Sequence, residues 1–97
     1  MTIRILRAAI ADLETGRRFY AQLGPGLGDH YLDSLFADID SLLLHAGVHP
    51  EIQGYHRLLA KRFPYAVYYK VSGETVLVYR VLDCRQDPRK TEKALGD

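Results

Sequence analysis

The stretch that decides the fold covers residues 55–88 and reads YHRLLAKRFPYAVYYKVSGETVLVYRVLDCRQDP. It holds two runs rich in β-branched and aromatic residues, 65–71 and 75–82, joined by a short polar turn that contains a glycine. This arrangement is typical of a β-hairpin. A weaker strand is predicted at 55–59, and Pro64 stands just before the next strand, where its missing N–H breaks no ladder. The second half of the chain is therefore predicted to be antiparallel sheet.

Two helices are predicted upstream of this sheet. Apolar residues recur every three or four positions over residues 9–23 and again over residues 31–46, which is the period of a helix with one buried face. Residues 24–28, Gly-Pro-Gly-Leu-Gly, interrupt the pattern. Because this linker is short, the helices are predicted to pack as an antiparallel hairpin. A short apolar segment at 3–6 is predicted to be an N-terminal strand.

Together these elements predict an α+β fold, with a single domain over residues 1–97. Its N-terminal strand is followed by an antiparallel helix hairpin, packed on one face of a mainly antiparallel sheet of about four strands. The charged tail, residues 89–97, is predicted to be mobile or loosely helical. A chain of 97 residues can bury one modest core. The apolar residues expected in that core are Leu13, Tyr20, Leu35, Ile39, Leu42, Val67 and Val78.

The composition is that of an ordinary globular protein, with 47% hydrophobic and 26% charged residues. No apolar run approaches the roughly 20 residues that span a bilayer, and the start of the chain lacks the pattern of a secretory signal. Cys84 is the only cysteine, so an internal disulfide is impossible and a reducing cytoplasm is expected.

The net charge of +1 hides an asymmetry between the two halves. Residues 1–54 carry four arginines against seven acids, whereas residues 55–97 carry nine arginines and lysines against five acids. The sheet and the tail are therefore expected to hold the positive potential, which could attract an acidic partner or a phosphate backbone.

Three sequence patterns that can indicate a binding or catalytic site are better explained as structural features. The glycines of residues 24–28 follow a helix, whereas a dinucleotide fingerprint follows a strand. His45 and His49 have the spacing of a helical metal pair, but a glycine between them and Pro50 after them break the helical face. Cys84 has no base at a recognisable spacing. Neither a metal nor a cofactor is expected.

The tyrosines of the predicted strands are a stronger candidate for a binding surface. Some of them must lie on the sheet face that the helix hairpin leaves open. Such a face could stack bases and hold phosphates, or it could dock a peptide. The tyrosines are Tyr65, Tyr68, Tyr69 and Tyr79, and the surrounding cations are Lys61, Arg62, Lys70, Arg80 and Arg85.

The order of these segments over about 85 residues resembles the RelE/ParE family of toxins from type II toxin-antitoxin systems, which also act in plasmid stabilisation. Residues 26–35 look like the family's second helix. Residues 63–69, Phe-Pro-Tyr-Ala-Val-Tyr-Tyr, look like its Pro-Tyr-Arg-hydrophobic-x-Tyr strand. Residues 78–88 look like its closing strand, which often ends in His-x-x-Arg-Asp-Pro.

The resemblance favours the ParE-like branch, whose members inhibit DNA gyrase by binding it and need no catalytic groups. Family members that cleave mRNA on the ribosome usually carry cations where this chain has Ala66 and Gln86. Asp83 stands where a histidine is often found. Cleavage of RNA needs a base for the 2′-hydroxyl and cations for the developing phosphorane charge. The alternatives are a RelE-like ribosome-dependent mRNA endonuclease and a member of the fold without toxicity.

The resemblance also implies partners and site residues. A cognate antitoxin is expected to cover the open sheet face and the hairpin grooves, with DNA gyrase as the target, or the ribosome and mRNA in the alternative; no membrane is expected. The catalytic residues of a nuclease would be Arg85, Tyr65, Lys61 and Arg80. The residues expected to bind are Tyr65, Tyr68, Arg80, Arg85, Arg89, Lys90 and Lys93.

Overall fold

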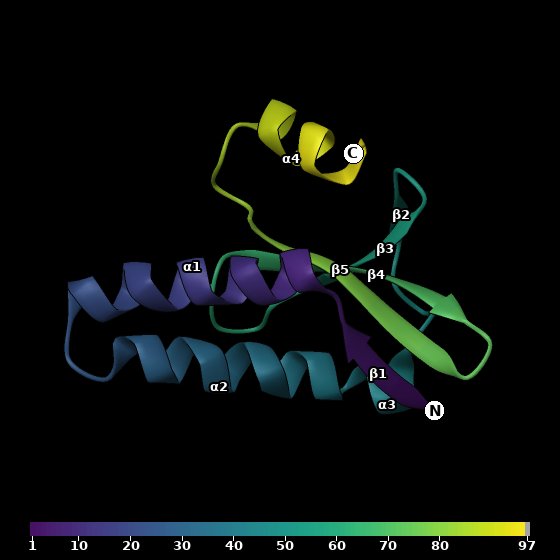
Figure 1. Ribbon diagram of the computed structural model, residues 1–97, viewed down its shortest axis with the longest axis horizontal. Helices are drawn as coiled ribbons and strands as arrows, with labels where there is room; N and C mark the ends of the chain where they lie inside the picture. The colour runs from purple at the N-terminus through teal and green to yellow at the C-terminus, as the bar shows by residue number, and fades with distance from the viewer. Residues whose placement is uncertain (97) are drawn as a thin grey trace.

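The computed structural model describes residues 1–96, which form a five-stranded sheet, a helix hairpin and two shorter helices (Figure 1). In chain order the elements are β1 (Thr2–Ile5), α1 (Arg7–Leu23), α2 (Leu27–Asp40), α3 (Leu42–His45), β2 (Glu51–Ile52), β3 (Tyr55–Leu59), β4 (Tyr65–Ser72), β5 (Thr75–Asp83) and α4 (Pro88–Gly96). None of the helices in residues 1–96 combines the length and the hydropathy needed to cross a membrane.

The strands are ordered β1-β5-β4-β3-β2, with β1 parallel to β5 and every other pair antiparallel. The predicted α+β fold with a mainly antiparallel sheet is confirmed. The strand count differs, because the sheet has five strands instead of about four. The additional strand, β2, has two residues and is too short to leave an alternating pattern in the sequence.

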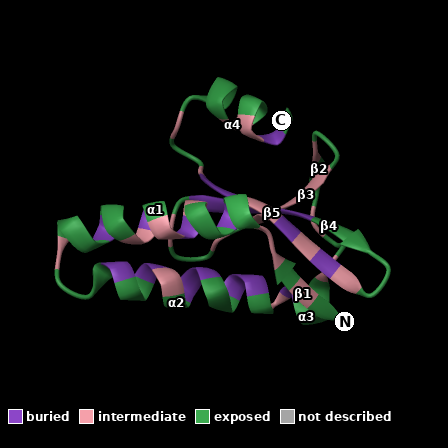
Figure 2. Ribbon diagram, in the orientation of Figure 1, coloured by how far each residue is buried: buried purple, intermediate pink, exposed green. Residues whose placement is uncertain are grey.

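The helix hairpin packs closely because a glycine faces an aromatic ring. A Cβ on Gly16 of α1 would lie 2.4 Å from the Tyr31 ring of α2, so a larger residue cannot occupy this position without a shift. Figure 2 shows that the buried residues of α2 lie along the side that faces α1. The predicted second helix, 31–46, is divided in the structure: α2 ends at Asp40, and α3 begins after Ser41, whose hydroxyl donates to the backbone carbonyl of Asp38 (2.6 Å).

The main core lies between the hairpin and one face of the sheet. All seven residues predicted to be in the core are buried there. A bulge between β4 and β5 brings more apolar side chains to this face. Tyr68 pairs with Arg80 but Tyr69 pairs with Val78, so Tyr79 is an extra residue on β5. The alternation of β5 side chains between the two sheet faces therefore shifts by one residue at Tyr79. As a result Val78 and Val81, three positions apart, both join the main core.

A second, smaller cluster lies on the opposite face of the sheet, under α4. It consists of Ala66, Tyr68, Leu82 and Leu95. Successive residues of a strand point to opposite faces, which is why Val67 joins one core and Tyr68 the other.

Of the two alternatives for the tail, mobile or loosely helical, the structure has a helix, α4. Residues 88–96 form this helix and its Leu95 is buried at 4% exposure; residue 97 lies outside the described residues. The signal that starts this helix is Asp87-Pro88. The Asp87 carboxylate accepts the Arg89 N–H (2.9 Å), as an N-cap does, and proline suits the first helical position.

We expect Ile39→Ala to lower the free energy of unfolding by about 2–5 kcal/mol, because it leaves a cavity in a closely packed core. Ile39 is 1% exposed. The matched control is Ile10→Ala, in α1, where the side chain is 56% exposed and the expected loss is about 0.5 kcal/mol or less. Urea denaturation measures both, and equal losses would show that the buried face of α2 is misassigned.

Candidate functional site

The strongest cluster of charged and aromatic groups lies where β5 ends. The Arg85 guanidinium donates to both carboxylate oxygens of Asp83 (3.0 and 2.9 Å) and to the Tyr20 hydroxyl (3.3 Å). It also lies 5.8 Å from the centre of the Phe19 ring. The hydrogen bond from Arg85 lowers the pKa of the Asp83 carboxyl, and the same bond raises the pKa of Arg85. The cation is therefore largely neutralised within the chain.

Tyr65 lies next to this pair but is buried. Its side chain is 7% exposed, and its ring contacts those of Tyr20 and Tyr31 at centroid distances of 6.2 and 5.0 Å. Burial raises the pKa of Tyr65 to about 12, with a further rise from Asp83 and an opposing effect of Arg85. A hydroxyl with this pKa stays protonated at neutral pH, so Tyr65 is a poor candidate for a general base.

Arg80 makes a structural ion pair with the first helix. Its guanidinium donates to both carboxylate oxygens of Asp12 (2.7 and 2.9 Å), and Asp12 also accepts the Val81 N–H (2.9 Å). The Asp12 side chain is 14% exposed. The pair therefore attaches α1 to β5. The helical period alone could not reveal this contact, because it does not show which polar residues of α1 lie beside β5.

The other predicted residues do not join the Arg85 cluster. Lys61 lies in the β3–β4 connection, where its backbone N–H donates to the Asp38 carboxylate (3.2 Å) and its side chain is exposed. Tyr68 is 4% exposed in the cluster under α4, where burial raises its pKa and Arg57 opposes that rise. The exposed cations of α4 are Arg89, Lys90 and Lys93.

The expectation that some strand tyrosines lie on the face away from the hairpin holds for Tyr68, while Tyr65 lies on the hairpin side. The hairpin covers Tyr65 and α4 covers Tyr68. The aromatic group on the part of the second face nearer the β4–β5 turn consists of Tyr55 and Tyr79, with ring centroids 5.1 Å apart. The Lys70 ammonium lies 4.6 Å from the Tyr55 ring and 5.5 Å from the Tyr79 ring.

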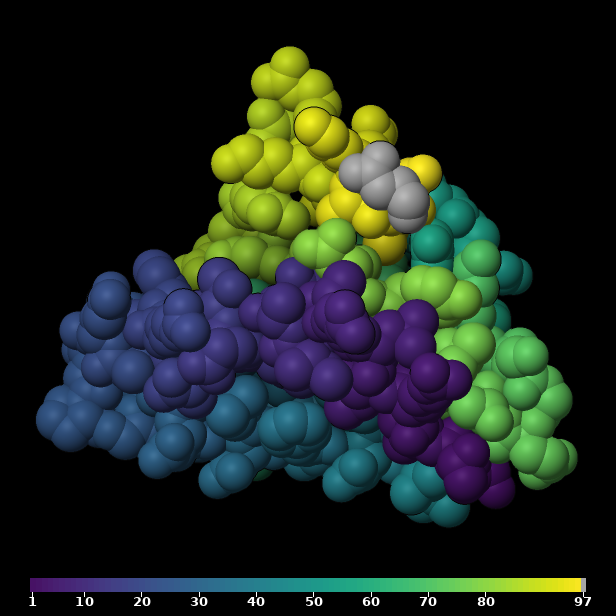
Figure 3. Space-filling view, viewed as in Figure 1, coloured from purple at the N-terminus to yellow at the C-terminus, as the bar shows by residue number. Residues whose placement is uncertain are grey.

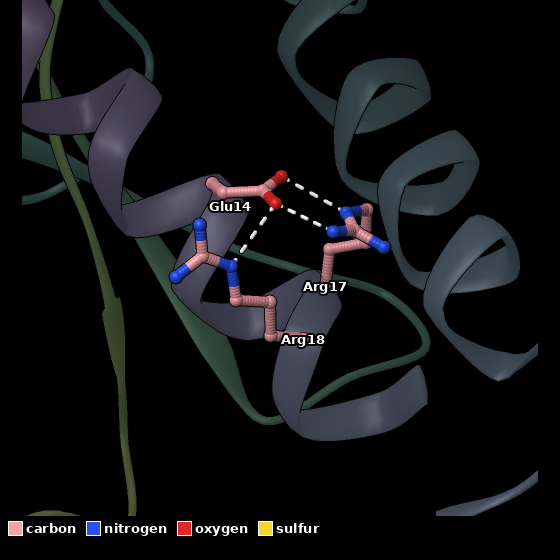
Figure 4. Close-up of polar contacts among 3 residues, drawn as sticks. All are labelled: Glu14, Arg17 and Arg18. Atoms are coloured by element: carbon pink, nitrogen blue, oxygen red, sulfur yellow. Dashed lines mark hydrogen bonds and ion pairs between the residues drawn. The ribbon is translucent and has the colours of Figure 1, made fainter. Parts of the chain in front are cut away.

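An apolar groove opens on the outside of the helix hairpin. Its volume is about 400 Å³, and it is lined by Ile5, Ile10, Leu13, Glu14, Leu32 and Phe36. Glu14 is the charged residue of this lining. Figure 4 shows its carboxylate held by Arg17 and Arg18, and the hydrogen bond from Arg17 lowers the pKa of Glu14 to about 2. The carboxylate therefore stays ionised at neutral pH, while the rest of the groove can receive apolar side chains.

The sequence of residues 3–88 matches the family described as ParE toxin of type II toxin-antitoxin system, parDE. The chain belongs to the ParE toxin family. The matched range ends at the first residue of α4. None of the curated proteins matches this chain.

A solved structure shows the same fold as this ParE-family chain. It is described as a chromosomal ParDE TA system from P. aeruginosa, and it superposes with a TM-score of 0.76 at 24% sequence identity. The alignment covers 84% of this chain and 92% of the other. The predicted resemblance to the RelE/ParE family is confirmed by the family match.

The residues predicted for the site of this ParE-family toxin are not all neighbours in the structure. The structure brings together Arg85 and Tyr65, but Arg80, Lys61 and Tyr68 lie in three other environments. Within residues 1–96, no group of three or more histidines, cysteines and acids is placed to hold a metal ion. The groove of the hairpin was expected only in general terms, because its residues are far apart in the sequence and become neighbours when α1 packs on α2.

We expect Asp12→Ala to lower the free energy of unfolding by about 1–3 kcal/mol, because it removes charge-assisted hydrogen bonds between α1 and β5. The control is Asp33→Ala on the exposed side of α2, where a change of about 0.5 kcal/mol or less is expected. Chemical denaturation measures both variants. A loss for Asp12→Ala no larger than that of the control would mean that the contact with Arg80 adds nothing to stability.

Proposed function

We propose that residues 1–97 act as one toxin domain that inhibits DNA gyrase by binding it, without cleaving a substrate, and that a cognate antitoxin neutralises it. Membership of the ParE toxin family supports the toxin role. Gyrase and its DNA are cytoplasmic, and a lone Cys84 suits a reducing compartment. The cytoplasm is therefore the proposed location.

The observation that carries the binding mechanism is the state of the candidate catalytic groups. Arg85 is paired with Asp83, Arg80 is paired with Asp12, and Tyr65 is buried with a raised pKa. Cleavage of RNA requires a base within reach of the 2′-hydroxyl and cations aimed at the phosphate. The two arginines are instead paired with carboxylates and Tyr65 lies in the core. The fourth candidate, Lys61, is exposed in the β3–β4 connection, away from the others. The arrangement supports a toxin that acts by binding more than a RelE-like mRNA endonuclease.

The proposed contact surface for gyrase is α4 and the segment that leads to it. In the space-filling view, α4 projects from the body of the molecule (Figure 3). Its cations are Arg89, Lys90 and Lys93, and the Arg89 side chain is 87% exposed beside Asp87. Exposed positive charge on a projecting helix can be attracted to a large complex of protein and DNA.

We expect the triple change Arg89→Ala, Lys90→Ala and Lys93→Ala to weaken gyrase inhibition about tenfold, because three exposed charges each contribute on the order of 0.5 kcal/mol. Accumulation of gyrase–DNA cleavage complexes, measured with purified gyrase and supercoiled DNA, is the readout. Arg85 is left intact because it also holds Asp83 and Tyr20.

Arg18→Ala, on the outer side of α1 with a side chain 72% exposed, is the matched control and should inhibit like the unaltered chain. A parallel assay follows mRNA on translating ribosomes. Ribosome-dependent cuts in mRNA with gyrase unaffected would replace this proposal with the endonuclease. Neither activity, together with normal growth on induction, would indicate a non-toxic member of the fold.

The hairpin groove is the proposed docking place for the antitoxin. The family name pairs this toxin with an antitoxin. The groove exposes apolar side chains, and an exposed apolar patch is typical of a surface that binds a partner. Ile10 is 56% exposed and Phe36 is 40% exposed on opposite sides of it. A segment of the antitoxin that folds on binding could place apolar residues between them.

We expect Phe36→Asp to weaken antitoxin binding by about 30-fold or more, because an aromatic residue in the centre of an interface commonly contributes at least 2 kcal/mol. The protein encoded beside this chain is the antitoxin to be tested, by co-purification and by titration. The matched control is Leu44→Asp on α3, where the side chain is 84% exposed outside the groove. Equal effects of the two changes would exclude the groove as the docking place.

A further inference from the structure

The segment that joins the helix hairpin to the sheet, residues 46–50, is fastened to two strands by one tyrosine and two histidines. Tyr69 of β4 is fully buried, and its hydroxyl contacts the Gly47 N–H (2.9 Å) and Nδ1 of His49 (2.5 Å). The His56 ring of β3 stacks on Tyr69 at a centroid distance of 5.1 Å. Nδ1 of His56 also contacts the backbone carbonyl of His49 (2.8 Å).

The chemistry of these groups fixes the direction of two hydrogen bonds and ties the third to the protonation of His49. The Gly47 N–H can only donate, so the Tyr69 oxygen accepts from it. The other partner of that hydroxyl is Nδ1 of His49, which can accept the hydroxyl proton only when this nitrogen is itself unprotonated. The carbonyl of His49 can only accept, so Nδ1 of His56 carries a proton. Among these contacts, the Tyr69 hydroxyl proton therefore has an acceptor only when His49 is neutral with Nδ1 unprotonated.

We propose that residues 46–50 form a proton-sensitive latch, which is closed when His49 is neutral and opens when Nδ1 of His49 takes up a proton. A protonated Nδ1 is a donor facing a hydroxyl that carries its own proton. That hydroxyl would lose its acceptor in a place closed to water. A buried donor without a partner is costly, so the segment is expected to leave Tyr69.

The surroundings of His49 also favour its neutral form. Burial lowers the pKa of His49, and His56 and His45 lower it further. These groups come from β3 and α3, and Tyr69 comes from β4. No carboxylate in residues 1–96 is among the groups that shift the pKa of His49. Burial raises the pKa of Tyr69, against the effect of the Gly47 and His49 backbone, so its hydroxyl stays neutral.

The sign of the pH effect follows from the lowered pKa. The unfolded or released segment binds a proton on His49 more readily than the closed latch does. The latch therefore contributes its full stability above the ordinary value of 6.5, and this contribution is lost as pH falls through the lower pKa of the closed state. The segment contains Val48 and closely follows Leu44, and these side chains are 74% and 84% exposed. Proton uptake would thus loosen residues 46–50 and the exposed apolar side chains on and next to this segment.

Hydrogen exchange of the Gly47 amide tests the latch directly, because that N–H is bonded to the Tyr69 hydroxyl. Exchange is followed by NMR between about pH 7.5 and 5, with the intrinsic rate divided out. We expect the opening equilibrium to rise by up to about tenfold for each pH unit below the ordinary histidine pKa. The measurement uses the isolated chain and does not depend on its target or on an antitoxin.

Three variants separate the roles of the residues. His49→Gln keeps an oxygen that can accept the Tyr69 hydroxyl but cannot titrate, so protection of Gly47 should become independent of pH. His45→Gln is the matched control from the same corner and should keep the pH dependence. Tyr69→Phe removes the hydroxyl, so protection should be low at every pH.

Two results would overturn the latch. The first concerns the pH dependence of Gly47 exchange. If it persists in full in His49→Gln, or disappears in His45→Gln, a group other than His49 controls the opening. The second applies even if a variant fails to fold: a His49 ring in the unaltered protein that titrates at or above the value of an unfolded histidine. Either result would leave the assignment to gyrase untouched, because that assignment is measured on cleavage complexes.

Discussion

The contact between Gly16 and the Tyr31 ring sets the arrangement on which the rest of the structure depends. Because Gly16 has no side chain, α1 and α2 approach until the ring fills the space where a Cβ would lie. The same ring meets Tyr20, Phe63 and Tyr65 at centroid distances of 5.0 to 5.3 Å. One glycine therefore lets the hairpin and the sheet share a single aromatic core. Packing at interior density transmits any displacement here to both layers.

The functional surfaces are built outward from this core. The Tyr20 hydroxyl accepts from Arg85, so the end of β5 is attached to the first helix. On the other side of the hairpin, the close approach of α1 and α2 leaves the apolar groove between Ile10 and Phe36. The proposed antitoxin surface and the segment leading to the proposed gyrase surface are thus positioned by the same aromatic contacts, although they face different directions.

Several charged side chains of this toxin pair with one another and join parts of its own fold. Arg80 and Asp12 join α1 to β5, Arg85 and Asp83 close the end of β5, and Arg17 and Arg18 hold Glu14. Counting charges by chain half correctly located the positive surplus in the sheet and tail, but it could not tell paired cations from exposed ones. The ion pairs at Arg80 and Arg85 show that cations of the sheet can serve to join its strands to the first helix and to close the end of β5.

The sequence by itself determined the elements whose signals are local: the hairpin of β4 and β5, the helical periods of α1 and α2, and the seven core residues, all of which are buried. These follow from side-chain period and turn chemistry, which neighbouring residues express. Asp87-Pro88 was also a local signal, for the start of α4, and was interpreted only as the end of a strand. Strand alternation puts Tyr65 and Tyr68 of β4 on opposite faces, but only the tertiary structure decided that the hairpin covers Tyr65 and that α4 covers Tyr68. It also decided the partners of Asp12 and His49, since contacts between residues 69 and 20 positions apart in the chain arise from the way the layers stack.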